Sequence, residues 1–402
     1  MKVQEVILRT LSGQYQWHEA AEILGVSERT IYRWKWRYER HGYNGLYDHR
    51  RQRPSPKRVP VATIQQVLTL YRERYRGWNV AHFTEQVRTH HGVHLSYSWI
   101  KAALQGAGLV AKCRQRGGHR QRRPRRPLPG MLLFQDASTH AWWPTPEGSQ
   151  QDLLVLLEDA TSEVYDAMFV PQENTVSVLA QLRRVVEAQG VFCSLYTDKG
   201  SHFVTTRTGR SPHQPQVATD PTQVERALRE LGISLIPAHS PQARGRMERL
   251  FGTWQGRLPQ VLAQHGIRDY VAANRFLRQH WLAYHRQHWS VPATQPGTAF
   301  VPCHRADLAQ VFALQHERTV ANDNTVQYGH VVFQLAPSTL RVSFAKCRVL
   351  VYDHLDGTVS IGYGPHTLGR YDLQGHVLNG NSRAVEKIHH NHSAVSSRAL
   401  NN

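Results

Sequence analysis

The sequence predicts a multidomain protein with α-helical units at the N-terminus, an α/β core with a mixed sheet, and a small β-barrel near the C-terminus. Three patterns predict this fold class. Apolar residues recur at helical spacing up to residue 111, and strand-like and helical segments alternate from residue 131. Short strands separated by glycine turns then occupy residues 318–376. A chain of 402 residues is long enough for each pattern to have its own core.

The composition favours a polyanionic partner. The chain has 49 lysine and arginine residues against 30 acidic residues, which gives a formal net charge of +19. Such a charge favours nucleic acid over a membrane surface, because no apolar run approaches the roughly 18 residues that span a bilayer. The four cysteines lie far apart and are expected to be free thiols in a reducing compartment. We therefore expect a cytoplasmic protein that binds nucleic acid and no membrane.

Residues 1–52 are predicted to form a helix-turn-helix DNA-binding domain of three helices. Gly25 provides the turn before the third helix, and Ile31 lies on the face of that helix that packs inward. The side chains predicted to contact DNA are those of Ser27, Arg29, Arg33 and Arg37. The alternative is a three-helix bundle with no ligand, but the arginine stripe favours DNA binding.

A second helix-turn-helix domain, possibly winged, is predicted over residues 60–111. Its presumed recognition helix carries only one cation, Lys101, so a purely structural bundle is nearly as good an interpretation. A basic linker is predicted over residues 112–130, because so many positive charges cannot pack in a core. Its predicted DNA contacts are Arg120, Arg122, Arg123, Arg125 and Arg126. The alternative for this segment is a solubilising spacer.

The catalytic core is predicted over residues 131–290, where three strands are followed by alternating helices and strands. This order predicts a mixed sheet covered by helices on both faces. Asp136 lies in the first strand, Asp198 ends the fourth strand, and Glu248 lies on the helix after HSPQARG. The barrel over residues 318–376 either binds DNA or a partner protomer or merely packs on the core, and a polar tail follows over 377–402.

Three carboxylates of this kind are typical of a metal site. Carboxylates are hard oxygen ligands that suit Mg²⁺ or Mn²⁺, and three like charges are costly to gather without cations between them. Two divalent ions can activate a water or a 3′-hydroxyl and stabilise the leaving oxygen, which is the chemistry of phosphodiester transfer. Four other acids nearby compete for this role but are expected at strand edges, namely Asp152, Glu158, Asp159 and Glu163.

The pattern D…TDxGxxF…SPQxxGxxER resembles that of the DDE transposase and retroviral-integrase superfamily, whose catalytic core is RNase H-like. Together with the two helical units and the barrel, it looks like a bacterial insertion-sequence transposase of the ISNCY type. The resemblance covers nearly the whole chain. It implies that Asp136, Asp198 and Glu248 are both the catalytic residues and the ligands of Mg²⁺ or Mn²⁺, with two ions per active site.

The sequence departs from the family pattern at two points. Lys199 stands where integrases often have asparagine, and it is predicted to reach a DNA phosphate, as is Arg244 before the third acid. Asp198 and Glu248 are separated by 49 residues, more than in retroviral integrases. The excess fits an inserted loop at residues 205–220, to which no role is assigned.

The resemblance implies a nucleoid-associated enzyme that binds the terminal inverted repeats of a mobile element and then cleaves and joins DNA strands. Both element ends and the target DNA must be held together, so at least a dimer is expected. Two alternatives stay open at this point. One is an RNase H-like nuclease without strand transfer, and the other is a domesticated DNA-binding regulator without catalysis.

Overall fold

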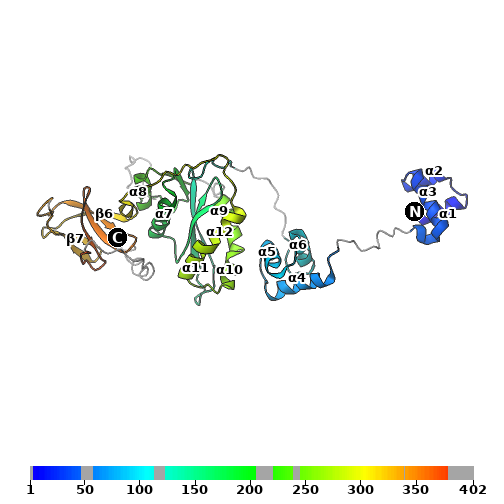
Figure 1. Ribbon diagram of the computed structural model, residues 1–402, viewed down its shortest axis with the longest axis horizontal. Coiled ribbons are helices and arrows are strands. Elements are labelled where there is room, and N and C mark those ends of the chain that lie inside the picture. The colour runs from blue at the N-terminus through cyan, green and yellow to red at the C-terminus, as the bar shows by residue number, and fades with distance from the viewer. Residues whose placement is uncertain are drawn as a thin grey trace, which may run out of the picture. The chain divides into compact units, whose positions relative to one another are not determined.

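The computed structural model describes residues 3–46, 58–112, 123–204, 221–238, 245–338 and 340–378 (Figure 1). The chain divides into two compact units. The first comprises Met1–Arg76 and Phe83–Lys112, and the second comprises Gly77–His82 and Cys113–Asn402. Within the described residues, no helix is both long enough and apolar enough to cross a membrane.

The first helical domain contains three α-helices, which are α1 (Val3–Leu11), α2 (Trp17–Leu24) and α3 (Glu28–His41), followed by the 3₁₀ turn η1 (Gly42–Leu46). Its core is built from Val6, Ala20 and Ile31, all with 0% exposure. Gly25 ends α2 with a φ of 60°, a left-handed conformation that glycine adopts without steric cost. The predicted helix-turn-helix geometry is therefore present.

The second helical domain contains α4 (Val61–Glu73), α5 (Val80–His91) and α6 (Tyr97–Gly106). Phe83 is fully buried, and its ring meets that of Tyr71 at a centroid distance of 5.0 Å. The Ser96 hydroxyl accepts a hydrogen bond from the Trp99 N–H at 3.2 Å and caps α6. Between residues 58 and 112 the structure has no strand, so this domain lacks the possible wing.

The α/β core contains a five-stranded mixed sheet with the order β3-β2-β1-β4-β5. Its strands are β1 (Leu133–His140), β2 (Gln151–Glu158), β3 (Val164–Val170), β4 (Ser194–Thr197) and β5 (Ser234–Pro237). β1, β2 and β3 pair antiparallel, whereas β4 is parallel to both β1 and β5. This mixed sheet confirms the predicted core and agrees with the RNase H-like fold that the resemblance implies.

Helices cover both faces of this sheet (Figure 1). Two of them, α7 (Thr175–Gln189) and α8 (Gln223–Glu230), pack on the face that includes Leu133 and Leu195. The opposite face, which includes Phe134, is covered by α9 (Gly245–Gln255), α10 (Leu258–Gln264), α11 (Tyr270–Phe276), the π-helical turn η4 (Leu277–Trp281) and α12 (Leu282–Trp289). The last three segments follow one another directly from Tyr270 to Trp289.

A side chain forms hydrogen bonds with the outer backbone of the edge strand β3. The Asn274 carboxamide on α11 accepts a hydrogen bond from the Phe169 N–H at 2.7 Å and donates one to the Phe169 carbonyl at 3.0 Å. Asn274 is 4% exposed. Its amide therefore satisfies the two backbone groups that a further strand would otherwise pair with.

The C-terminal region is not the closed barrel that the sequence predicted. Its helix α13 (Leu308–Val311) precedes six strands, which are β6 (Leu314–Thr319), β7 (Thr325–Tyr328), β8 (Val331–Gln334), β9 (Arg348–Asp353), β10 (Val359–Tyr363) and β11 (His366–Tyr371). They form a four-stranded sheet, β11-β10-β9-β6, and a separate two-stranded sheet, β7-β8. Side chains of both sheets share one core that includes Phe333 and Ile361. Strands of two small facing sheets and strands of a barrel show the same alternation of apolar residues, so the sequence pattern does not distinguish the two folds.

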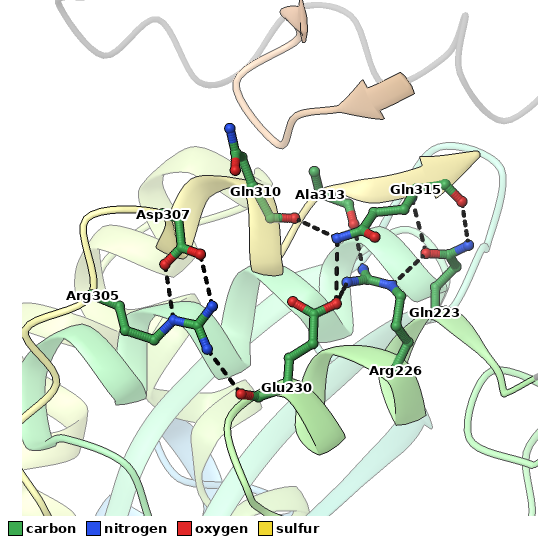
Figure 2. Close-up of polar contacts among 8 residues, drawn as sticks. All are labelled: Gln223, Arg226, Glu230, Arg305, Asp307, Gln310, Ala313 and Gln315. Atoms are coloured by element: carbon green, nitrogen blue, oxygen red, sulfur yellow. Dashed lines mark hydrogen bonds and ion pairs between the residues drawn. The ribbon is translucent and has the colours of Figure 1, made fainter. Parts of the chain in front are cut away.

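A polar network joins this region to α8 of the core (Figure 2). The Gln223 carboxamide accepts from the Gln315 N–H at 3.0 Å and donates to the Gln315 carbonyl at 2.8 Å. Arg226 donates to the Ala313 carbonyl and to Glu230, both at 2.7 Å. Packing of the C-terminal sheets on the core, one of the two interpretations given for this region, is thus observed.

Candidate functional site

Asp136 and Asp198 come from two adjacent parallel strands. β1 pairs with β4 through Leu133 with Leu195 and Phe134 with Tyr196. Asp198 directly follows β4, and the same offset continued by two residues would place it opposite Asp136. Side chains alternate along a strand, so the two carboxylates share the face of the Phe134 and Tyr196 rings, whose centroids lie 5.3 Å apart. Both aspartates are partly buried.

Backbone N–H groups hold both carboxylates. The Ala137 N–H donates to Asp136 Oδ1 at 3.0 Å, and the Gly200 N–H donates to Asp198 Oδ1 at 2.8 Å. A Cβ atom at Gly200 would meet Asp198 Oδ1 at 3.0 Å, so the turn after the second acid favours glycine. Lys199 is exposed beside it, and its contact with DNA stays a prediction.

Glu248 lies in the first turn of α9, the helix that covers the same face of the sheet. Met247, Leu250 and Trp254 form the buried stripe of this helix, and Glu248 borders that stripe as an exposed side chain. The other end of α9 is tied to β1, because Gln255 Nε2 donates to Ser138 Oγ at 2.9 Å. Glu248 therefore lies on the helix that covers the sheet face of Asp136 and Asp198.

The three carboxylates do not form a closed metal cluster in this structure. In the described parts of the chain, no three His, Cys, Asp or Glu side chains are placed to hold one metal ion. Asp136 and Asp198 nevertheless offer the hard oxygen ligands that Mg²⁺ and Mn²⁺ prefer, and their aligned strands hold them on one face. That these two residues and Glu248 converge on a divalent ion stays a prediction.

The helix α3 exposes its cations as the sequence predicted. Arg29, Arg33 and Arg37 are all exposed, while Ile31 is fully buried. Ser27 occupies the N-cap position, but its hydroxyl lies 3.0 Å from that of Thr30 instead of capping a backbone N–H.

Trp36 on the same helix was not predicted from the sequence to be part of this surface. Its side chain is 51% exposed and lies under the guanidinium of Arg40, at 4.4 Å from the ring centroid. An exposed tryptophan among arginines is typical of a nucleic-acid surface, because the ring can stack on a base while the cations meet phosphates. The signal was present in the sequence as the alternation of tryptophan with basic residues in RWKWR.

The corresponding helix of the second domain, α6, is much less basic. Lys101 is exposed, and its Nζ lies 5.8 Å from the centroid of the Tyr97 ring. Tyr97 is itself 44% exposed. The two helices therefore share an exposed aromatic ring four residues before a cation, but α6 lacks the arginine stripe of α3.

The basic linker ends on the core instead of continuing as a separate arm. Arg123 forms an ion pair with Asp159, and Arg125 Nη1 donates to the Asp159 carbonyl at 2.8 Å and to Ser162 Oγ at 2.7 Å. These contacts give Arg123 and Arg125 partners on the core, because the buried Asp159 carboxylate requires cationic partners, and contact of these two arginines with DNA stays a prediction. Three other predicted DNA contacts, Arg120, Arg122 and Arg244, lie outside the described residues.

The acids that compete with the triad have structural partners. Asp152 accepts from Thr139 Oγ1 at 2.6 Å and from the Glu173 N–H at 2.8 Å. Glu158 is fully buried at the end of β2 and accepts from the Gly130 N–H at 2.9 Å. Glu163 pairs with Arg286 at 2.5 Å. Each carboxylate thus stabilises the fold around the site.

Glu173 and His202 lie near the site but were not predicted from the sequence. Glu173 Oε1 accepts from Gln135 Nε2 at 3.2 Å and lies 3.3 Å from His202 Nε2. His202 belongs to the turn that follows Asp198. The motif YTDKGSHF contains this histidine, but only strand pairing brings Glu173 close to it.

Comparisons with known proteins agree with this organisation. A family model described as a helix-turn-helix domain matches residues 4–55, and one described as a homeodomain-like domain matches residues 30–104. The chain is 28% identical over 366 residues to a Sinorhizobium fredii protein named as transposase y4bF, covering 90% of this chain and 79% of that protein. It is 27% identical over 318 residues to the transposase for insertion sequence IS1202 of Streptococcus pneumoniae, covering 70% of this chain and 67% of that protein.

Two solved structures are also similar to the chain. One is a simian T-cell lymphotropic virus intasome in complex with the PP2A regulatory subunit B56 gamma, with 13% identity and a TM-score of 0.33 over 71% of this chain and 91% of that chain. The other is the HTLV-2 integrase catalytic core domain in complex with magnesium, with 14% identity and a TM-score of 0.28 over 38% of this chain and 88% of that chain.

Proposed function

We propose that this chain is a transposase that binds the terminal inverted repeats of a mobile element and catalyses metal-dependent DNA strand cleavage and strand transfer. The observation that carries the proposal is the parallel pairing of β1 with β4 on the sheet face that α9 covers, whose offset, continued by two residues, would bring Asp198 opposite Asp136. Similarity to two transposases over 90% and 70% of the chain supports it independently.

Asp136, Asp198 and Glu248 would hold two Mg²⁺ or Mn²⁺ ions. When bound, such ions lower the pKa of an attacking water or 3′-hydroxyl and stabilise the oxygen that leaves. The chain itself orients the ligands, since the Ala137 and Gly200 N–H groups each hold one carboxylate oxygen of an aspartate. One site would serve both steps, with water as the first nucleophile and the new 3′-hydroxyl as the second.

Recognition of the element ends would belong to the helical domains. The exposed Arg29, Arg33 and Arg37 line one side of α3, the helix that enters the major groove in helix-turn-helix proteins. Lys101, Lys199 and the linker arginines would add phosphate contacts, which give affinity without sequence information. Because two ends and a target must meet, the active species would be at least a dimer.

A joining assay tests the proposal. A duplex that carries a pre-cleaved end of the inverted repeat flanking the gene is incubated with plasmid DNA and Mg²⁺ or Mn²⁺. The amide variants Asp136→Asn, Asp198→Asn and Glu248→Gln keep side-chain size but remove charge from the site. Each should lower the joining rate on the order of 1,000-fold, because metal ions contribute several kcal/mol to such transition states.

End binding, measured by gel shift, should be unchanged in all three variants. The matched control is Glu187→Gln, an acid on α7 that pairs with Arg183 and lies on the opposite side of the sheet. It should join DNA at the wild-type rate. If Asp136→Asn also joins the end at near the wild-type rate, the triad is wrong. Cleavage of an intact end without any joining would instead indicate the nuclease alternative.

A further inference from the structure

Asp159 joins three parts of the core. It follows β2, is fully buried, and its Oδ1 lies 2.8 Å from Arg246 Nη1 of α9. Its Oδ2 accepts from the Arg126 N–H at 2.7 Å, and Arg123 forms a second ion pair with Oδ1. One carboxylate therefore holds the loop after β2, the end of the linker and the first turn of α9.

The linker and α9 also contact each other directly. Arg246 Nη2 donates to the Arg123 carbonyl at 3.0 Å, while Nη1 donates to the Asp159 carbonyl at 2.7 Å. Arg246 is well covered, with a side chain that is 19% exposed. It lies two residues before Glu248 in the same helical turn. The contacts that hold Arg246 in place therefore also hold the helical turn that carries Glu248.

We infer that Asp159 is a positioning residue that couples the linker from the DNA-binding domains to the helix that carries Glu248. The inference rests on the proposed function, because it gives Glu248 a role in the chemistry. A buried carboxylate is stable only with its cationic partners in place, so ordering of residues 123–126 and ordering of the first turn of α9 favour each other. DNA that engages the linker would thereby stabilise α9 in its place on the sheet.

A merely structural ion pair would behave differently, and the core contains one for comparison. Arg184 of α7 pairs with Asp166 of β3 through Nη2 and Oδ2 at 2.7 Å, and Asp166 is 5% exposed. This pair is similarly buried, but it lies between β3 and α7, on the face of the sheet opposite to α9. Asp166→Asn is therefore the matched control for Asp159→Asn.

Hydrogen exchange of the full chain, followed by mass spectrometry, tests the coupling without any activity. In Asp159→Asn, amides of residues 249–255 and of residues 126–132 should both exchange at least about tenfold faster than in wild type. Asp166→Asn should accelerate exchange in β3 and α7 and leave α9 unchanged. Arg123→Gln should also accelerate exchange in α9, because Arg123 is connected to that helix through Asp159 and through its own carbonyl.

The Arg123 variant keeps the test decisive if Asp159→Asn does not fold, because the Arg123 side chain is 47% exposed. Unchanged exchange in α9 in both variants would overturn the inference. In the joining assay, Asp159→Asn should be slower by at least about tenfold at unchanged end binding, and Asp166→Asn should not. If the variants show the expected changes in exchange but the wild-type chain joins no DNA, the proposed function is wrong and the coupling still holds.

Discussion

In the first helical domain the charged side chains lie on the outside, whereas the α/β core buries several of its carboxylates. Arg29, Arg33 and Arg37 are exposed on α3, but Glu158 and Asp159 have no exposed surface at all. An exposed cation is available to a binding partner in solvent, and its removal lowers the stability of the fold only slightly. A buried carboxylate is held by partners from distant segments, so its removal disturbs the fold. Recognition and chemistry should therefore be separable by mutation.

The largest effect expected from this contrast is a pH dependence of the stability of the α/β core. Burial raises the pKa of Glu158 to about 7, while N–H groups of Gly130 and Ala160 oppose the shift and the charge of Asp159 adds to it. The folded-state pKa lies above the ordinary value of 4.5, so the contribution of Glu158 is fully present below pH 4.5 and is lost as pH rises through 7.

Core stability should then fall by roughly 3 kcal/mol across this pH window through Glu158 alone. Chemical denaturation of wild type and Glu158→Gln between about pH 4.5 and 8 measures the difference. The glutamine variant should be less stable at low pH, because its amide can accept only one of the two N–H bonds, and it should lack this part of the pH dependence. If the free energy of unfolding changed with pH equally in the two proteins, the pKa of Glu158 would not be raised in the folded state.

The next largest effect concerns the exposed cations of α3. Replacing Arg29 and Arg33 together by alanine should lower the preference for element ends over random DNA by about 10- to 100-fold, since a bidentate arginine–base interaction contributes about 1–3 kcal/mol of discrimination. The thermal midpoint should not change, because both side chains are exposed. Competition gel shifts at fixed salt measure the ratio. An unchanged ratio would show that α3 does not read the sequence.

The basic linker allows a comparison within a few residues. Replacing Arg120 and Arg122 by glutamine should reduce the slope of log K against log salt by about 0.9 for each phosphate that is no longer neutralised, at constant thermal stability. Arg123→Gln should instead lower the thermal midpoint, because Arg123 is paired with the buried Asp159. Binding titrations over a salt series, combined with melting curves, separate the two roles. If the two variants changed the salt slope and the thermal midpoint in the same way, the linker would not contain separate DNA-binding and structural arginines.

The smallest effect is expected in the second helical domain. Lys101 is the only cation on α6, so Lys101→Ala should weaken binding to any DNA by only about two- to threefold and leave the preference for element ends intact. The same titrations serve as the measurement. A fall in preference as large as that of the α3 variant would give both domains equal parts in recognition.

Much of this organisation is predictable from local sequence patterns. The turn at Gly25 and the start of α3 after Ser27 follow from short-range signals, because glycine and serine favour those backbone positions by themselves. Asp136 and Asp198 were found from strand patterns and a family motif. That they are neighbours depends on β4 pairing with β1, which skips β2 and β3, and no local pattern specifies that order.

Two features could not be predicted for the same reason. Asp159 meets Arg123 and Arg246 across 36 and 87 residues of chain, and nothing near Asp159 in the sequence indicates those partners. The C-terminal strands alternate as barrel strands do, and only their pairing shows two separate sheets. Residues that act through distant partners need the tertiary structure, whereas residues that terminate helices do not.

The side-chain amide of Asn274 on the edge strand has a consequence for how copies of the chain can meet. An uncovered edge strand invites a second molecule to add its own strand and so continue the sheet indefinitely. At Phe169 that position is already taken by a group of the same chain, which is buried and cannot be displaced without opening α11 from β3. In the proposed assembly on DNA, copies of the chain would thereby be kept from extending the sheet at this point of β3, and their association would depend on side-chain surfaces, which can form a closed and reversible assembly.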